Sequence, residues 1–512
     1  MMPGVFERVR KHLKGIVAPE GYYLNEHGEE VYGKLPRVKV ENPIKTLMRP
    51  SAMNYLYFFV GWMAWTVDGY DFHTISLSVS NLAKYYDRGR EEISTSITLT
   101  LLFRSLGAVI FGLAGDLYGR KWPMITNLVI IAALQLATAW CSTFAQFLAV
   151  RALFGIGMGG IWGLASSMGL ENMPMEARGL FSGVLQQGYA LGYLIAAGIN
   201  MGAVPRSPHS FKLLFYIGAG ITIAVALARL FFGESRQFVE RKAHEKAAGT
   251  KMTGKVKVKA FTKDAKGVLK KYWKRCIYAV IMMALFNYCS HGSQDMYPTY
   301  MQEMKGFSQK DASKATMIAK SGAVIGGTIC GYYSQTLGRR FTIVLACIVG
   351  ACLIPLWVLP TSWGTLTAGA FLLQFMVQGA WGVVPVHLQE LSPPQFRSAF
   401  PGICYQLGNM ISAPAAQITS TVSEKDTVWI DGEERPNYGK TQAGMMSVIF
   451  ILLAIWVASG REQLGSRFEL ARAAGDAEGM VEEGKAGEVE EGKSGSEESL
   501  EEDVKAGGKE TK

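Results

Sequence analysis

The chain has 512 residues, of which 49% are apolar and 18% are charged, and its formal net charge is +10. This low share of charged residues lies outside the usual range of soluble domains. The charges also gather at the two ends and in one central block. Between them lie apolar runs of about 20 residues, the length of a membrane helix. The composition therefore predicts an all-α membrane protein. Membrane topology and an anionic lipid surface explain the positive charge without a nucleic-acid partner.

Twelve apolar segments are predicted to cross the bilayer. They divide the chain into an N-terminal extension (1–50), a six-helix bundle (51–235), a basic linker (236–275), a second six-helix bundle (276–460) and an acidic tail (461–512). The twelve segments lie roughly at residues 53–80, 94–115, 123–142, 146–169, 179–203, 211–232, 276–301, 314–335, 341–360, 364–388, 398–421 and 441–460.

The basic linker sets the expected orientation in the membrane. It holds fourteen Lys and Arg residues against three acidic residues, and loops of this kind stay on the cytosolic side. With twelve spans, both termini are then cytosolic. The tail from residue 471 has thirteen acidic and six basic residues among many Gly and Ser, which predicts disorder. Both tails are therefore candidate sites for cytosolic regulators.

Charged residues occur inside the first, second and eighth spans. Arg104 lies near the middle of the second span, where an unpaired guanidinium would be costly. It could hold a substrate carboxylate by two parallel hydrogen bonds, or form a structural ion pair with Asp68 or Asp71 of the first span. Either aspartate could instead carry a transported proton. Lys320 in the eighth span is a second candidate cation, although its long side chain could also extend toward the outer membrane surface.

Two motifs recur at one offset of 219 residues. GLAGDLYGRK begins at Gly112 and GYYSQTLGRR at Gly331, and the pattern E-x2-P-x3-R-x2-F-x-G-x3-Q begins at Glu171 and again at Glu390. The shared offset indicates two homologous six-helix halves. Parallel repeats of this kind pack around an axis normal to the membrane, with a substrate site between the halves near the midplane.

The first motif, G-x3-D-x2-G-R-K between the second and third spans, resembles the loop signature of the major facilitator superfamily, and RALFGIGMGG resembles its fourth-span motif. In the second copy Gln335 replaces Asp116. The physical interpretation of this loop is a latch: Asp116, at a helix end, can pair with basic residues across the seam between the two halves and favour one state of a gate. A tight cytosolic turn with topology charges would explain the same loop. The gate residues expected from both motifs are Gly112, Asp116, Gly119, Arg120, Lys121, Glu171, Arg178, Arg339, Arg340, Glu390 and Arg397.

The seventh span carries a polar stripe, FNYCSHGSQDMYPTYM. At about 100° per residue, Asn287, Ser290, His291 and Gln294 share one helix face, with Asp295 beside them. These groups cannot face lipid and must line a polar cavity or pair with one another. Histidine titrates near physiological pH, so the His291–Asp295 pair is a candidate proton carrier. A polar interhelical pair without a transport role is the alternative.

This stripe matches N-x2-[ST]-H-x-[ST]-Q-D-x3-T and so resembles the signature of fungal lactate/pyruvate–proton symporters of the Jen type, in the sialate–proton symporter branch. The resemblance implies uptake of small carboxylates with protons at the plasma membrane: lactate, pyruvate, acetate or propionate, and in some members malate or succinate. It also implies transport or recognition roles for the Asn, His and Asp and for a glutamine in the eleventh span, here Gln406. The matching residues are Asn287, Ser290, His291, Ser293, Gln294, Asp295 and Thr299.

Gln187 and Gln406 end the second repeated motif in equivalent positions. Their amides could bond a hydroxyl, keto or carboxylate group of a substrate, or bond a neighbouring helix. The preference for mono- or dicarboxylates stays open.

Three other functions also stay open. DGYD in the first span is similar to a motif of aromatic-acid symporters, and GES after the sixth is similar to one of sugar symporters. A nutrient sensor without net flux is the third. The sequence shows no nucleophile triad, phosphate-binding loop or metal-ligand spacing, so we expect neither an enzyme nor a cofactor or metal site.

Overall fold

The computed structural model describes residues 41–234, 254–393, 396–430 and 432–460, together with residues 15, 20–24, 30–34, 239 and 462. Three predicted segments lie largely outside the described residues: the N-terminal extension, the first part of the linker and the acidic tail except Glu462. The disorder expected of the tail therefore stays a prediction.

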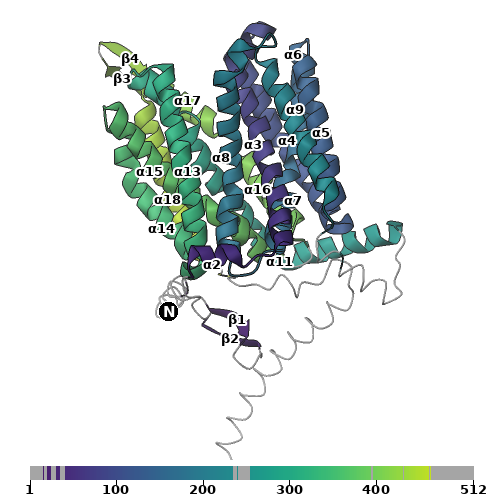
Figure 1. Ribbon diagram of the computed structural model, residues 1–512. Coiled ribbons are helices and arrows are strands. Elements are labelled where there is room, and N and C mark those ends of the chain that lie inside the picture. Colours follow the sequence, from purple (N-terminus) through teal and green to yellow (C-terminus); the bar gives the residue numbers. More distant parts are fainter. Residues whose placement is uncertain are drawn as a thin grey trace, which may run out of the picture.

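Long helices dominate the described chain, and the first group of them lies on one side of the molecule in Figure 1. A short helix, α2, and a single 3-10 turn, η1, accompany this group. Its members are α2 (Pro43–Met48), α3 (Ala52–Tyr86), α4 (Arg90–Tyr118), α5 (Lys121–Trp140), α6 (Phe144–Gly159), α7 (Ile161–Glu171), α8 (Arg178–Gly202), η1 (Val204–Arg206) and α9 (Lys212–Phe231).

The second group lies beside the first and is teal at α11 and green to yellow from α13 onward in Figure 1. It contains α11 (Gly254–Gln294), α12 (Tyr297–Thr299), the π-helical turn η2 (Tyr300–Met304), α13 (Gln309–Leu337), α14 (Arg339–Val358), α15 (Trp363–Leu391), α16 (Ala399–Ser412), α17 (Ala415–Lys425) and α18 (Tyr438–Ser459). The first part of α11 belongs to the predicted linker, and non-helical backbone angles at Tyr272 separate it from the part that crosses the bundle.

The few described strands form two small antiparallel pairs, β1 (Glu20–Leu24) with β2 (Glu30–Lys34), and β3 (Thr427–Ile430) with β4 (Glu433–Pro436). The β3–β4 hairpin lies at one end of the helices, and α2 lies at the other (Figure 1). We call the first the hairpin end. We call the second the Asp116 end, because α4 ends there.

Twelve segments cross the molecule, and the all-α fold predicted from the sequence is confirmed. Among the described residues, seven of these segments are long and apolar enough to be identified as membrane spans by length and hydropathy alone. They are formed by α4, α5, α6 with α7, α9, α14, α15 and α18. The other five, α3, α8, α11, α13 and α16 with α17, carry polar side chains at their buried faces, as the sections below describe. A helix that faces other helices need not be apolar all round.

Two predicted spans are interrupted in the structure. The seventh, expected to run to residue 301, leaves regular α-helix at Gln294, and the eleventh breaks between Ser412 and Ala415. Proline explains both interruptions, because Pro298 and Pro414 have no N–H to give to the carbonyl four residues earlier.

The two bundles touch closely at the Asp116 end. There α8 packs against α13 and α15, and α16 packs against α4. A Cβ built on Gly183 would lie 2.4 Å from the carbonyl oxygen of Gly327, and one on Gly112 would lie 2.9 Å from Cα of Ala399. These glycines therefore let backbones of opposite bundles meet.

Candidate functional site

The His291–Asp295 pair forms at the end of α11. Nδ1 of His291 lies 2.9 Å from Oδ2 of Asp295, and the two side chains are 20% and 40% exposed. His291 also hydrogen-bonds Asn409 of α16, and Asn409 donates to Gln406 Oε1 at 2.9 Å. The predicted proton carrier and the predicted glutamine thus belong to one connected polar chain, which solvent reaches at its Asp295 end.

The rest of the polar stripe makes hydrogen bonds within α11 and one to α15. Gln294 Nε2 donates to Ser290 Oγ at 3.0 Å, and Gln378 of α15 donates to the same oxygen at 3.4 Å. Asn287 donates to the carbonyl of Met283 on its own helix. These partners account for Asn287 and Ser290 without a ligand.

A small pocket opens beside the stripe, between α11, α13, α14 and α15. Gln294 and Lys320 line it, and Lys320 Nζ contacts Gln294 Oε1. Lys320 is only 9% exposed, and its Nζ lies 5.5 Å from the ring centroid of Tyr193 in the first bundle. Of the two positions expected for this lysine, the structure therefore gives the one that points into the protein.

The predicted acids and arginine of the first bundle have partners within that bundle. Arg104 Nη2 lies 2.6 Å from Oδ2 of Asp68, with both side chains almost fully buried. Asp71 accepts hydrogen bonds from Gln135 at 2.9 Å and from Thr222 at 3.1 Å. Arg104 thus forms the ion pair that the sequence offered as the alternative to carboxylate binding.

Aromatic side chains, which the sequence analysis did not single out, fill the space between the bundles. Tyr189 of α8 hydrogen-bonds Arg104 and stacks on Trp65 at 4.9 Å. Tyr405 of α16 stacks on Trp162 at 4.7 Å. Tyr405 directly precedes Gln406 in the repeated motif, so its position next to a predicted site residue was the available signal.

Gln187 does not join the chain that contains Gln406. Its buried amide has no hydrogen-bond partner among the described residues, and it packs against Gly327, whose Cβ would lie 1.8 Å from Gln187 Nε2. The two repeat-equivalent glutamines therefore lie in different surroundings, one between α8 and α13 and the other beside Asn409.

At the Asp116 end, the first copy of the loop motif bridges the two bundles. Asp116 Oδ1 accepts the backbone N–H of Ser398 at 3.1 Å and Oδ2 accepts that of Ala399 at 2.8 Å. Arg120 lies 3.3 Å from Asp116 and 3.0 Å from Glu171. Across the seam, the N–H groups at the start of α16 donate to the carboxylate of Asp116. Arg397 of the second bundle also lies within electrostatic range of Asp116, so the predicted pairing with a basic residue across the seam stays a prediction.

The second copy repeats this arrangement. Arg339 pairs with Glu390 through two N–H donors at 3.1 Å each, and Gln335 takes the position of Asp116 by accepting from Arg339 at 2.8 Å. Gly119 and Gly338 both have positive φ, 97° and 93°, which is why a glycine precedes the arginine in each copy.

The remaining predicted gate residues lie in the same layer. Arg178 donates to the carbonyl of Met173 at 3.0 Å. Arg397 of the second bundle lies within electrostatic range of Glu171 in the first. Lys121 donates from Nζ to the carbonyl of Leu230 at 2.8 Å.

Two glutamates bind the starts of helices in this layer, a role that the sequence analysis predicted for neither of them. Glu234, just after α9, accepts the backbone N–H groups of Arg120 and Lys121 at 2.9 and 3.0 Å. Glu462, just after α18, accepts that of Arg340 at 3.1 Å. Each follows the last helix of its bundle. The GES motif after the sixth span contains Glu234 and was the available signal for it, whereas the 219-residue offset does not align Glu234 with Glu462.

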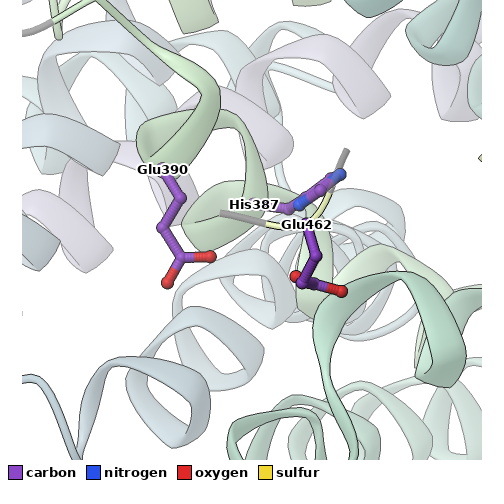
Figure 2. A group of neighbouring side chains, drawn as sticks. All are labelled: His387, Glu390 and Glu462. Atoms are coloured by element: carbon purple, nitrogen blue, oxygen red, sulfur yellow. The ribbon is translucent and has the colours of Figure 1, made fainter. Parts of the chain in front are cut away.

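Figure 2 shows three buried side chains of this layer, His387, Glu390 and Glu462, whose donor atoms lie within 4.8 Å of one another. A divalent cation could use such donors. However, Arg339 holds both oxygens of Glu390, and Arg340 holds one oxygen of Glu462. Two of the three groups thus have cationic or N–H partners, and we assign no metal here.

Two bundles of six spanning segments, joined at one end by a buried layer of charged side chains, are typical of membrane transporters of the major facilitator class. Residues 44–459 match the family described as "Sugar (and other) transporter", and the chain belongs to this family. The membership predicted from the loop motifs is confirmed, and the family consists of transporters rather than enzymes.

Relatives of known description agree with this assignment. The chain is 35% identical over 434 residues to a carboxylic acid transporter protein homolog of Saccharomyces cerevisiae, covering 82% of this chain and 70% of the relative. It is 26% identical over 361 residues to the sialic acid transporter NanX of Escherichia coli, covering 68% and 82%. These two relatives support the resemblance to the Jen type and to the sialate branch.

Solved structures share the fold. The proton:xylose symporter XylE bound to 6-bromo-6-deoxy-D-glucose superposes with a TM-score of 0.61 over 82% of this chain and 99% of that one, at 16% identity. This likeness concerns the fold alone.

Proposed function

We propose that this protein carries small carboxylates together with protons across the plasma membrane by alternating access, with the Asp116 end and both termini in the cytosol. Lactate and pyruvate, or short dicarboxylates such as malate and succinate, are the expected substrates. The single observation that carries the proposal is the half-exposed His291–Asp295 pair, connected through Asn409 to Gln406.

The chemistry requires a proton and an anion to load together. A carboxylate entering a low-dielectric space needs positive charge nearby, and an imidazolium needs a counter-ion. A protonated His291 beside Asp295 forms a neutral pair, and an arriving anion adds a second partner for the imidazolium. Each ligand therefore lowers the cost of burying the other.

The contacts described above correspond to an outward-facing state under this proposal. The bundles meet backbone to backbone at the Asp116 end, where Asp116 binds the start of α16. At the other end Asp295 keeps 40% of its side chain exposed. Breaking the Asp116 contacts would open the site to the cytosol. The charge layer of both repeats is thus proposed as the gate.

Uptake of labelled lactate and succinate by cells tests the proposal. His291→Ala and Asp295→Ala are expected to abolish acid-stimulated uptake, whereas His209→Ala, at an exposed turn, is expected to leave it unchanged. Full proton-coupled uptake in both site variants would overturn the assignment of the proton site.

A sensor that does not transport is separated by the same assay. Deleting residues 471–512 removes the acidic tail from residue 471 onward and keeps Glu462 and the described helices. A transporter keeps its flux without this tail. A sensor shows no flux in either form.

A further inference from the structure

Lys320 differs from two arginines that lie deep in the first bundle. Arg104 is held by Asp68 at 2.6 Å. Arg151 donates to Gln135 at 3.5 Å and lies 3.9 Å from the ring centroid of Phe154. Gln135 in turn donates to Asp71, so an acid lies close to each of these two arginines.

Among the described residues, the groups in direct contact with the ammonium of Lys320 are neutral. Its Nζ contacts the amide oxygen of Gln294 and faces the ring of Tyr193. Within the described part of the chain, no carboxylate oxygen lies within 4.0 Å of it. An ammonium has three N–H donors, and a cation that is 9% exposed gains strongly from an anionic partner.

Lys320 also lines the small pocket beside the proton site. Ser293, Gln294, Thr316 and Gln374 line the same pocket and supply hydroxyl and amide groups, while Trp357 and Tyr297 supply apolar walls. These lining groups match the chemistry of a short molecule with one acidic end and a hydroxyl or keto group.

We propose that Lys320 is the residue that binds the carboxylate of the transported substrate, in the pocket that it shares with Gln294. This inference rests on the proposed function. It moves the anion site from Arg104, which keeps its structural pair with Asp68, to the second bundle. The substrate carboxylate accepts from Nζ, and Gln294 turns to the substrate's hydroxyl or keto oxygen.

The position of Lys320 also explains why anion binding needs a proton. Asp295, His73 and Lys320 lie within electrostatic range of one another, with His291 paired to Asp295. While His291 is neutral, the negative charge of Asp295 balances Lys320 at a distance and repels an anion. Protonation of His291 neutralises the His291–Asp295 pair, and Lys320 is then available to a carboxylate.

Contact with the first bundle connects loading to the transport cycle. Lys320 on α13 faces Tyr193 on α8, and these helices belong to opposite bundles. A carboxylate bound at Nζ would weaken the cation–π contact with Tyr193. Loading would therefore change a contact that spans the seam.

The test compares KM and maximal rate for labelled lactate, and binding of lactate to the purified protein, in Lys320→Met, Lys320→Arg and a control. Lys310→Met, on the exposed start of the same helix, serves as the control. We expect Lys320→Met to raise KM and Kd at least about tenfold, Lys320→Arg to stay within about threefold, and the control to match the wild type. Lactamide, which lacks the charge, should inhibit lactate binding with an equally weak inhibition constant in the wild type and in the three variants.

An unchanged KM and Kd in a folded Lys320→Met variant would overturn the inference. If that variant does not give a monodisperse protein, Lys320→Gln replaces it, and equal KM values for Lys320→Gln and Lys320→Arg would overturn it as well. Failure of the proposed function looks different, because the wild type itself would then take up no carboxylate.

Discussion

The carboxylate of Asp116 binds the backbone of Ala399 across the seam between the two bundles, with an O–N distance of 2.8 Å. Asp116 belongs to the end of α4 and Ala399 is the first residue of α16, so one side chain of the first bundle holds the start of a helix in the second. A charged acceptor at a helix N-terminus also gains from the helix dipole.

Asp116→Asn is expected to loosen this end of the protein. The amide keeps one acceptor and turns one N–H donor toward the backbone N–H groups, so at least one charge-assisted bond of about 1.5–3 kcal/mol is lost. Hydrogen exchange of residues 398–402 should become roughly ten times faster or more. Asp311→Asn, at the exposed first turn of α13, is the matched control, and equal exchange in both variants would contradict the bridging role.

Glu390→Gln is expected to destabilise the fold strongly. Arg339 is fully buried and binds both oxygens of Glu390, and removing one partner of a buried pair costs about 3–5 kcal/mol because the other charge is left uncompensated. Thermal unfolding in detergent measures the loss. Glu433→Gln breaks an exposed pair with Arg435 and should cost at most about 1 kcal/mol. Similar decreases of the unfolding temperature in both variants would show that burial does not determine how much an ion pair contributes to stability.

Much of the charge layer at the Asp116 end could be predicted from the sequence, because its motifs occur in both halves of the chain. The 219-residue offset places Arg120 with Arg339 and Glu171 with Glu390, and the structure pairs them in the same way in each bundle. Span lengths follow equally directly from the thickness of the bilayer. The His291–Asp295 pair follows from helical spacing, since residues four apart share a face.

Contacts between distant segments were harder to predict. Periodicity shows that Tyr405 and Tyr189 lie on helices, but not that they meet Trp162 and Trp65 between the bundles. The partner of Arg104 was one of several options, because the choice depends on how α3 and α4 are rotated against each other. Glu462 was assigned to the acidic tail, although its side chain is fixed at the start of α14.

Gly112→Ala is expected to slow transport by keeping the bundles apart at the Asp116 end. The new Cβ would lie 2.9 Å from Cα of Ala399, and overpacking of this kind costs about 1–3 kcal/mol. The closed arrangement should therefore lose roughly fivefold to a hundredfold in population, and the maximal uptake rate should fall. Gly220→Ala has nothing within 4 Å of its Cβ and is the control. Wild-type uptake by Gly112→Ala would rule out a close approach at this point during the cycle.

Glu462 is expected to make stability depend on pH. Burial raises the pKa of its carboxyl group to about 7, from an ordinary value of 4.5. Because the pKa is higher in the folded protein than in the unfolded chain, this group's contribution to stability is fully present below pH 4.5 and is lost as the pH rises through about 7. Glu462→Gln cannot ionise, so the midpoint of thermal unfolding should fall less between pH 5 and pH 8 in this variant than in the wild type. Parallel pH profiles for the two proteins would mean that Glu462 titrates as it does in water, and that the carboxyl group at the start of α14 is not buried in solution.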